Sequence, residues 1–362
     1  MFRLTQLIYY ANFLANRLNE DLTMTNKKKV TVKYIAEKAG VSYATASLSL
    51  SGKGRISEST RKKVLEVASN LGYIAEDRPA SNIPLMAFID TNSHMGGFYI
   101  SLIEGVIERL KEDNYAVILD ICGEFGPDKI MERKKVLERL YQDCDGILIL
   151  SHWGVTVDEI LQFLDHKIPF VVLDGGISGF ERNYVTVDHY QGAFDAVEYL
   201  IKAGHRNIAH ISGPKSHEHA QLRFKAYIDA LERYKLPLRE DYTVEGDYHK
   251  RSATAAMEKL LEVKPVPSAV FVANDNMAII AMQIAKDKGY RIPEDISFVG
   301  FDDIQAAELS EPPLTTVRQP LYDVGREGAE MLIGLMKSGN ILTEPRVLKT
   351  RLVLRESVKE RR

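Results

Sequence analysis

The chain has 362 residues, of which 45% are hydrophobic, and its formal net charge at pH 7 is −3. This length and composition suit two or three domains with buried cores and exclude a chain that is disordered throughout. No apolar run approaches the roughly 20 residues that span a bilayer, so a membrane is not an expected partner. Cys122 and Cys144 each lie beside an apolar run, which indicates reduced thiols in a cytoplasmic protein rather than a disulfide or a metal pair.

Residues 1–23, which include the run LIYYANFLA, resemble a weak signal peptide. No clear small-residue cleavage site precedes the basic segment that follows, so export is not expected. We expect translation to begin at Met24, which would make residues 1–23 an upstream extension. The alternative is an added helix.

The segment from Val30 to Gly52 predicts two short helices that meet at a Gly-Val-Ser turn. Thr31 is expected to cap the first helix, Gly40 to supply the positive φ of the turn, and Ser42 to cap a second helix through Ser49. The pattern is that of a helix-turn-helix, whose second helix reads DNA in the major groove. The apolar inward face of the first helix is expected to consist of Ile35, Ala36 and Ala39.

Charge in this region also indicates a polyanionic partner. Residues 25–63 hold ten Lys and Arg against Glu37 and Glu58, in a chain whose overall charge is slightly negative. A solvated basic helix would show the same excess, so the charge alone leaves both interpretations open. After a loop, Ser57 is expected to cap a third amphipathic helix with Val64, Val67, Ala68 and Leu71 on its inward face.

The run AEDRPASNIP, residues 75–84, predicts a linker. Pro79 could begin a helix, but Pro84 disfavours the α conformation at Ile83, so a two-turn hinge helix is not expected here.

From Leu85 onward, short apolar runs alternate with longer amphipathic segments. Such runs are typical of buried parallel strands, and the alternation with helices predicts a doubly wound α/β architecture in two lobes. The expected strands are LMAFID, YAVILDI, GILIL, FVVLD, NIAHIS, AVFVA and ISFVGFD, and the expected helices include YISLIEGVIERLKE, KIMERKKVLERLYQD, AFDAVEYLIKAG and MAIIAMQIAKDKG.

The run VTVKYIAEKAGVSYATASLSLSG, followed by RISESTRKKVLEVASNLGYI, resembles the DNA-binding headpiece of the lactose-repressor/galactose-repressor (LacI/GalR) family. The resemblance is dense from Val30 to Ile74 and continues to about Arg355 through VANDNMAIIAM and VGFDDIQAAELSEPPLTTVRQP. It implies a three-helix headpiece and two doubly wound lobes of the periplasmic-binding-protein type, between which the chain crosses three times, near Thr186, Thr316 and Val347.

The resemblance implies a division of the chain that we state as an expectation. The headpiece would occupy residues 24–74, the linker 75–84, the first lobe 85–186 and 317–346, the second lobe 187–316 and 347–356, and a tail 357–362.

The resemblance also implies the residues that meet DNA. At the positions where many members carry long polar side chains, this chain has Ala44 and Leu48, so contact with thymine methyl groups is one possibility. The full expected set is Thr31, Ser42, Tyr43, Ala44, Thr45, Ser47, Leu48, Lys53 and Arg55.

Polar residues that follow the apolar runs point to a small-molecule site, because ligands of doubly wound sheets lie beyond the carboxyl ends of the strands. By resemblance to the family, the effector would contact Phe98, Asp174, Arg223, Tyr248, Asn274 and Asp302. Asp, Asn and Arg can satisfy paired sugar hydroxyls, while an aromatic face covers the C–H patch of the ring. Each Asp taken alone is as well explained by a helix cap, and Tyr248 and Phe98 by core packing.

No catalytic or metal chemistry is expected. His217, Glu218 and His219 lack a third patterned ligand, and no Ser, Cys or Lys lies in a recognisable nucleophile turn. The expected function is a transcriptional repressor without a cofactor that binds operator DNA as a homodimer and responds to a sugar-like effector between its lobes. A nucleobase co-repressor and a two-lobed sugar receptor without a regulatory role are the alternatives.

Overall fold

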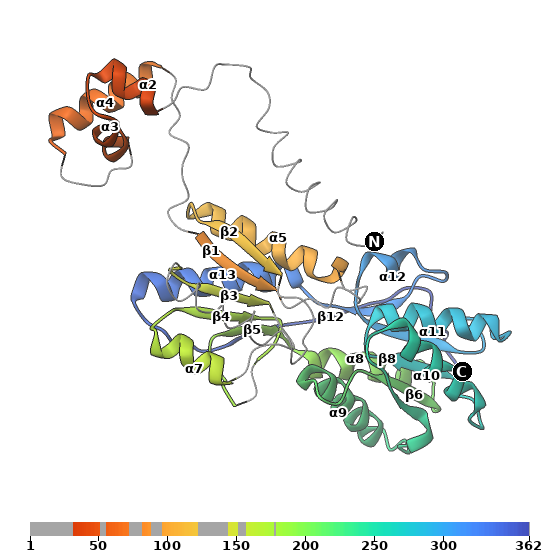
Figure 1. Cartoon of the computed structure of the whole chain (residues 1–362). Helices are drawn as coiled ribbons and strands as arrows, with labels where there is room; N and C mark the ends of the chain where they lie inside the picture. Colours follow the sequence, from red (N-terminus) through yellow and green to blue (C-terminus); the bar gives the residue numbers. More distant parts are fainter. Residues whose placement is uncertain are drawn as a thin grey trace. The chain divides into compact units, whose positions relative to one another are not determined.

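The structure of the chain is a computed structural model, and it describes residues 32–50, 56–71, 82–87, 96–121, 144–150, 157–176 and 179–361 (Figure 1). The chain divides into two units, Met1–Ala80 and Ser81–Arg362. The described residues contain no helix that is long and apolar enough to cross a membrane.

The first unit contains three helices, α2 (Val32–Ala39), α3 (Tyr43–Leu50) and α4 (Glu58–Asn70). The predicted turn is confirmed, because Gly40 has a φ of 66° and α3 begins three residues later. Ser42 and Ser57 each accept a hydrogen bond from the backbone N–H three residues on, as predicted for helix caps. The core of this unit is made by Ile35, Ala36, Ala39, Ala46, Val64 and Ala68, with Val67 and Leu71 packed against it.

The second unit contains two sheets, each with six strands. In the first sheet all neighbouring pairs are parallel, as the apolar runs predicted. Its strands, in spatial order, are β11 (Arg346–Leu348), β5 (Tyr184–Val187), β4 (Phe170–Leu173), β3 (Ile147–Leu150), β1 (Asn82–Ala87) and β2 (Ala116–Ile121).

Helices cover both faces of this first sheet (Figure 1). Leu148 and Leu150 of β3 join one core with α5 (Gly96–Glu112) and α13 (Leu321–Ser338). Ile147 and Ile149 of the same strand join the opposite core with α7 (Val157–Asp165). Alternate residues of one strand therefore fill two cores, which is why the strand is apolar throughout.

The second sheet has the order β12 (Arg351–Val353), β10 (Thr315–Arg318), β9 (Ser297–Asp302), β8 (Ala269–Val272), β6 (Ile208–Ser212) and β7 (Thr243–Glu245), and only β12 is antiparallel to its neighbour. The helices α8 (His189–Lys202) and α9 (Glu218–Arg233) pack with one face of the sheet. The helices α10 (Lys250–Glu262) and α11 (Asp275–Asp287) pack with the other face. The short helices η2 (Glu240–Tyr242) and α12 (Gln305–Leu309) complete this lobe.

The crossings between the sheets lie a few residues beyond the expected positions. The chain leaves the first sheet after β5, returns after β10, and crosses for the third time at Lys349 and Thr350, between β11 and β12. Residues 317 and 318 thus belong to the second sheet, and residues 347 and 348 to the first. The expected boundaries were wrong by a few residues because β10, β11 and β12 are too short to show an apolar run of their own.

Two further boundaries are corrected. The strand β1 begins at Asn82, so the last three residues of the expected linker form part of the first sheet. Residues 357–361 are not a separate tail, because Ser357 is fully buried and its hydroxyl donates to the carbonyl of Phe298 at 2.6 Å. The expected helix at 129–143 lies outside the described residues, as does Cys122, whereas Cys144 is half-buried.

Candidate functional site

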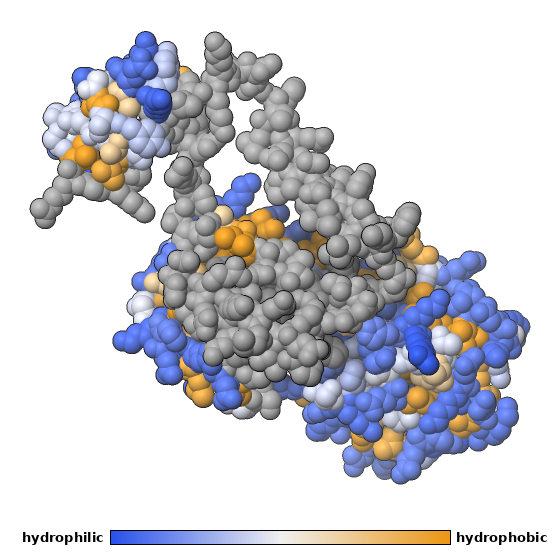
Figure 2. Space-filling model, in the orientation of Figure 1, coloured by the Kyte–Doolittle hydropathy of each residue, from blue (hydrophilic) through white to orange (hydrophobic). Residues whose placement is uncertain are grey.

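The helix α3 presents the expected DNA-reading residues at the surface of the first unit. Its side chains Ala46 and Ser49 are buried, which turns the opposite face outward. Tyr43 is 59% exposed and Leu48 is 38% exposed, and Ser42 and Ala44 are also exposed. Thr45 and Ser47 are half-buried. Figure 2 shows apolar residues scattered among hydrophilic ones on the visible face of this unit.

Exposed basic side chains lie on the other two helices of this unit. Lys33 and Lys38 of α2 and Lys62 and Lys63 of α4 are exposed. The other expected DNA contacts, Thr31, Lys53 and Arg55, lie outside the described residues. The described part of this unit thus combines a small apolar and hydroxyl-bearing reading surface with cations that suit phosphates.

In the second unit, three of the expected effector residues lie at the carboxyl ends of strands, one in the first sheet and two in the second. Asp174 follows β4, Asn274 follows β8, and Asp302 ends β9. Asp174 and Asp302 have positive φ values of 61° and 125°, which are unusual for residues with a side chain. All three are at most 7% exposed.

Residues of the two lobes come close together near these strand ends. Burial raises the pKa of Tyr99 well above its ordinary value, and the nearby charges of Asp174 and Asp302 raise it further. Burial raises the pKa of Tyr248. The same two carboxylates raise it further, and the positive charge of Arg223 lowers it. Tyr99 and Asp174 come from the first lobe, Tyr248 and Asp302 from the second, so the lobes bring these groups within electrostatic range of one another.

Tyr99 was not predicted as a site residue, although its neighbour Phe98 was. Phe98 is buried in the first lobe's core, and its ring meets that of Tyr99 edge-on with centroids 4.9 Å apart. Two aromatic residues in succession at the start of an amphipathic helix were the available signal, but periodicity alone does not say which of them reaches the site.

Arg223 is held by contacts on several sides. It is 3% exposed on α9, and its Nη1 donates to the carbonyl of Ala273. Its Nη2 lies 3.3 Å from Nδ1 of His189, and its guanidinium carbon lies 3.9 Å from the centre of the Phe301 ring. The guanidinium is therefore fixed in position before any ligand arrives.

A row of stacked rings adjoins Arg223. The ring of Tyr248 lies nearly parallel to those of His217 and His219, with centroids 6.0 and 5.9 Å away. His189 extends the row, 5.5 Å from His219. Of these histidines, His217 and His219 were considered in the sequence as metal ligands, and His189 was not considered. No group of three or more suitable metal-binding side chains occurs in the part of the chain that the structure describes.

Asp302, Asn274 and Asp275 have partners within the protein. Gln319 donates to Asp302 Oδ1 at 2.7 Å, and Asn274 Oδ1 accepts the N–H of Met277 at 3.0 Å, so Asn274 is also the N-cap of α11. Asp275, the first residue of α11, accepts hydrogen bonds from the backbone N–H of Ile304 and from Thr316, and burial raises its pKa well above the ordinary value.

Comparison with known proteins identifies both units. Residues 31–76 match the family model described as bacterial regulatory proteins, lacI family, and residues 197–358 match a periplasmic binding protein-like domain. The chain is 33% identical over 337 residues to the probable HTH-type transcriptional repressor ExuR of Bacillus subtilis, covering 91% of this chain and 98% of that protein.

Two solved structures are also similar along nearly their whole length. A complex of the transcriptional regulator CelR with cellobiose has a TM-score of 0.69 at 32% identity, covering 90% of this chain and 99% of the other. The Lac repressor dimer bound to operator and the anti-inducer ONPF has a TM-score of 0.74 at 26% identity, covering 92% and 100%. The headpiece, the two parallel-sheet lobes and the extent of these matches show that the chain belongs to the LacI family of bacterial regulatory proteins.

Proposed function

We propose that this regulator is a homodimeric repressor that binds operator DNA through the surface of α3 and responds to a sugar-like effector held between its two lobes. The observation that carries the effector assignment is the convergence of Tyr99 and Asp174 from one lobe with Tyr248 and Asp302 from the other. The relatives named above are transcription regulators and not enzymes, and two of them were solved with small molecules, cellobiose and ONPF.

The chemistry of the cleft suits a sugar. Carboxylates accept the hydroxyl hydrogens of a sugar ring, Arg223 and the amide of Asn274 donate to its oxygens, and the ring of Tyr248 covers its apolar face. The Nδ2 of Asn274 is buried without a hydrogen-bond partner among the described residues, so an acceptor on the ligand would satisfy it.

The proposed control of DNA binding is linkage between two sites. A ligand that contacts both lobes favours the arrangement in which those contacts are made, and it alters DNA affinity only by its preference for that arrangement. In a dimer the two headpieces would contact two half-sites, so a change in lobe geometry would change their spacing.

A flat nucleobase is the second candidate, because the stacked rings of Tyr248, His217 and His219 offer an aromatic surface to a planar ligand as well as to a sugar. A thermal-shift screen of sugars and nucleobases on the full chain separates the two, since a cleft ligand stabilises the folded state by mass action.

The same ligands are then added to an operator-binding assay. A ligand that both raises the melting temperature and changes DNA affinity supports the proposal. A ligand that stabilises the protein without any effect on DNA binding supports the alternative of a two-lobed receptor without a regulatory role.

A further inference from the structure

The helix α3 lacks every side chain that commonly reads guanine, adenine or cytosine by strong hydrogen bonds. Its sequence, YATASLSL, contains no Arg, Lys, Asn, Gln, Asp or Glu. In the major groove, Arg and Lys pair with guanine, Asn and Gln with adenine, and Asp and Glu with cytosine. An operator that is read through this helix must therefore be recognised by other groups.

The hydroxyl groups of this segment are a weak substitute. The hydroxyls of Ser42 and Thr45 share a hydrogen bond of 2.8 Å, and Ser42 also accepts the backbone N–H of Thr45. These two groups thus serve the helix cap, and Ser49 is buried. Tyr43 and Ser47 remain, but a hydroxyl both donates and accepts, so it does not by itself distinguish one base edge from another.

The centre of the outward face of α3 is apolar. Ala46 and Ser49 are buried, and the residues on the opposite side of the helix are Ala44 and Leu48. Since they are four residues apart, Ala44 and Leu48 are neighbours on the helix surface, and both are exposed. The apolar group that marks one base in the major groove is the 5-methyl group of thymine. Two adjacent apolar side chains therefore match a base that carries a methyl group.

We infer that Leu48 and Ala44 determine operator specificity by packing against thymine 5-methyl groups, so that each half-site carries thymine beneath the centre of α3. This inference rests on the proposed function and specifies which bases the helix reads. The exposed lysines of this unit are on α2 and α4, where they suit phosphates and add affinity without sequence preference. Methyl contacts add discrimination, because a base without the methyl group buries less apolar surface against the helix.

The test uses deoxyuridine, which differs from thymidine only in lacking the 5-methyl group. An operator is first selected from random duplexes with the full chain, and each of its thymines is then replaced singly. We expect one or two positions in each half-site at which the replacement weakens binding about fourfold, the value expected for burial of one methyl group. A cytosine placed at the same position should bind about fourfold more tightly when it carries a 5-methyl group.

Variants assign the methyl contacts to particular side chains. In Leu48→Ala the penalty for deoxyuridine should fall below about twofold at one position, and in Ala44→Gly at a neighbouring position. Each penalty compares two DNAs with the same protein, so a general loss of stability cancels. Leu65→Ala is the matched control, because Leu65 is an exposed leucine on α4 of the same unit. It should leave every penalty unchanged.

The outcomes separate this inference from the proposed function. If the chain selects an operator but deoxyuridine weakens binding nowhere, or if the penalties persist in both α3 variants, the methyl assignment is wrong while operator binding stands. Selected half-sites without thymine would also contradict it, as would an equal fall of the penalties in Leu65→Ala. If no selected duplex binds more tightly than random DNA, the proposed function fails as well.

Discussion

At the scale of single residues, the effector site depends on side chains that the fold holds in place. Asp302 is buried at a positive φ and accepts a hydrogen bond from Gln319, so its carboxylate is held in a fixed position. Asp302→Ala should weaken effector binding by roughly 2 to 4 kcal/mol, because buried polar groups of ligand and protein lose their partner.

Calorimetry with the effector found in the screen measures this loss. Asp241→Ala, at an exposed carboxylate paired with Arg239 on the surface of the second lobe, is the control and should change the affinity little. DNA binding without the effector should survive in both variants, and an unchanged affinity for Asp302→Ala would remove this residue from the site.

Another residue-scale prediction concerns acid stability. Burial lowers the pKa of His205 and of His210 to about 4, against about 6.5 in an unfolded chain. As the pH falls below about 6.5, the two histidines bind protons in the unfolded chain, whereas in the native state they do so only near pH 4. The free energy of unfolding should therefore fall until the pH reaches about 4. His210 is wholly buried and should alone account for about 3 kcal/mol of this loss.

Denaturant unfolding at a series of pH values measures whether the free energy of unfolding falls as the pH falls. His210 stacks on Phe271 and Tyr227, so His210→Phe keeps an aromatic ring there while removing the titrating group. This variant should show a shallower fall in stability with acid than the wild type. The control His166→Gln, at an exposed position, should keep the wild-type slope, and a slope unchanged in His210→Phe would contradict the prediction.

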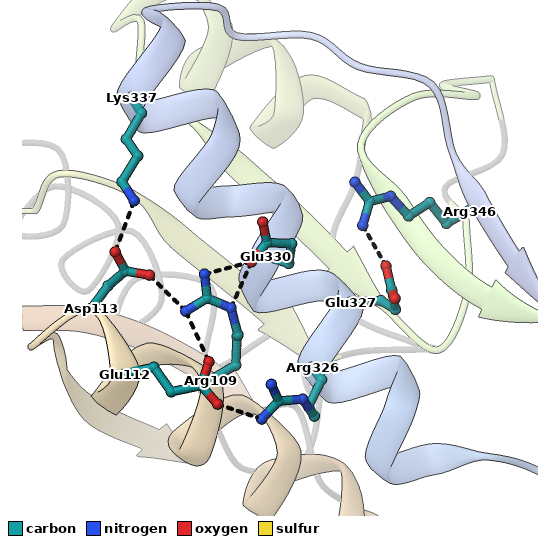
Figure 3. Close-up of polar contacts among 8 residues, drawn as sticks. All are labelled: Arg109, Glu112, Asp113, Arg326, Glu327, Glu330, Lys337 and Arg346. Atoms are coloured by element: carbon teal, nitrogen blue, oxygen red, sulfur yellow. Dashed lines mark hydrogen bonds and ion pairs between the residues drawn. The ribbon is translucent and has the colours of Figure 1, made fainter.

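At the scale of elements, the helices α5 and α13 of the first lobe meet through glycine. A Cβ at Gly105 would overlap the carbonyl oxygen of Tyr322, and a Cβ at Gly325 would overlap that of Leu102. The two backbones are therefore in direct contact. Ion pairs flank this contact, with Arg109 reaching Glu330 and Asp113, Arg326 reaching Glu112, and Lys337 reaching Asp113 (Figure 3).

The glycine contact should contribute more to stability than the flanking ion pairs, which are at least partly exposed and are worth little each. We predict that Gly325→Ala destabilises the protein by about 1 to 3 kcal/mol, because the helices must separate. Gly334→Ala on the same helix is the matched control, since nothing lies within 4 Å of its Cβ. It should be neutral or stabilise by up to about 1 kcal/mol through helix propensity. Chemical unfolding measures the free energy of unfolding of both variants. Equal changes in the two variants would show that the backbones of α5 and α13 are not in close contact at Gly325.

Elements with strong local signals could be predicted from the sequence, and those that depend on distant neighbours could not. The headpiece helices follow from Gly40 and two serine caps, and β3 and β8 follow from apolar runs. The strands β11 and β12 are only three residues long and are defined by pairing with β5 and β10. The row of rings beside Arg223 was missed for the same reason, since the ring centroids of His189 and His219 lie 5.5 Å apart only after α8 and α9 have packed.

At the scale of the whole molecule, DNA affinity should depend steeply on salt. Residues 25–63 carry ten basic residues against two acidic ones in a chain of net charge −3, so binding must release condensed counterions. We predict a loss of roughly a thousandfold in affinity between about 50 and 200 mM salt. A titration of operator DNA at several salt concentrations measures it.

Removal of residues 1–74 is the companion experiment and should abolish DNA binding while leaving effector binding in place. A truncated protein that binds DNA as well as the full chain does would show that the first unit is not the DNA-binding part.

The geometry of bound operator depends on the segment that joins the two units. Asn82 pairs with Ala116 in the first sheet and Ile83 is fully buried, so the sheet takes up the end of the expected linker. Residues 75–81 remain, and their structure lies outside the described residues. Pro79 lacks the N–H that a helix interior requires, and between Glu76 and Asn82 there is no large apolar side chain to wedge into a base step.

We therefore predict that the operator is bent less than it is by proteins that insert apolar side chains into the minor groove, and that phosphate contacts supply a larger share of the affinity. Energy transfer between dyes at the two ends of a bound operator measures the bend, and minor-groove probes report on the central base steps. Ala80→Leu adds a side chain able to intercalate and should increase the bend if residues 75–81 reach the groove. A sharp central kink in the unmodified complex, with protection of one central step, would show that the segment folds on DNA despite Pro79.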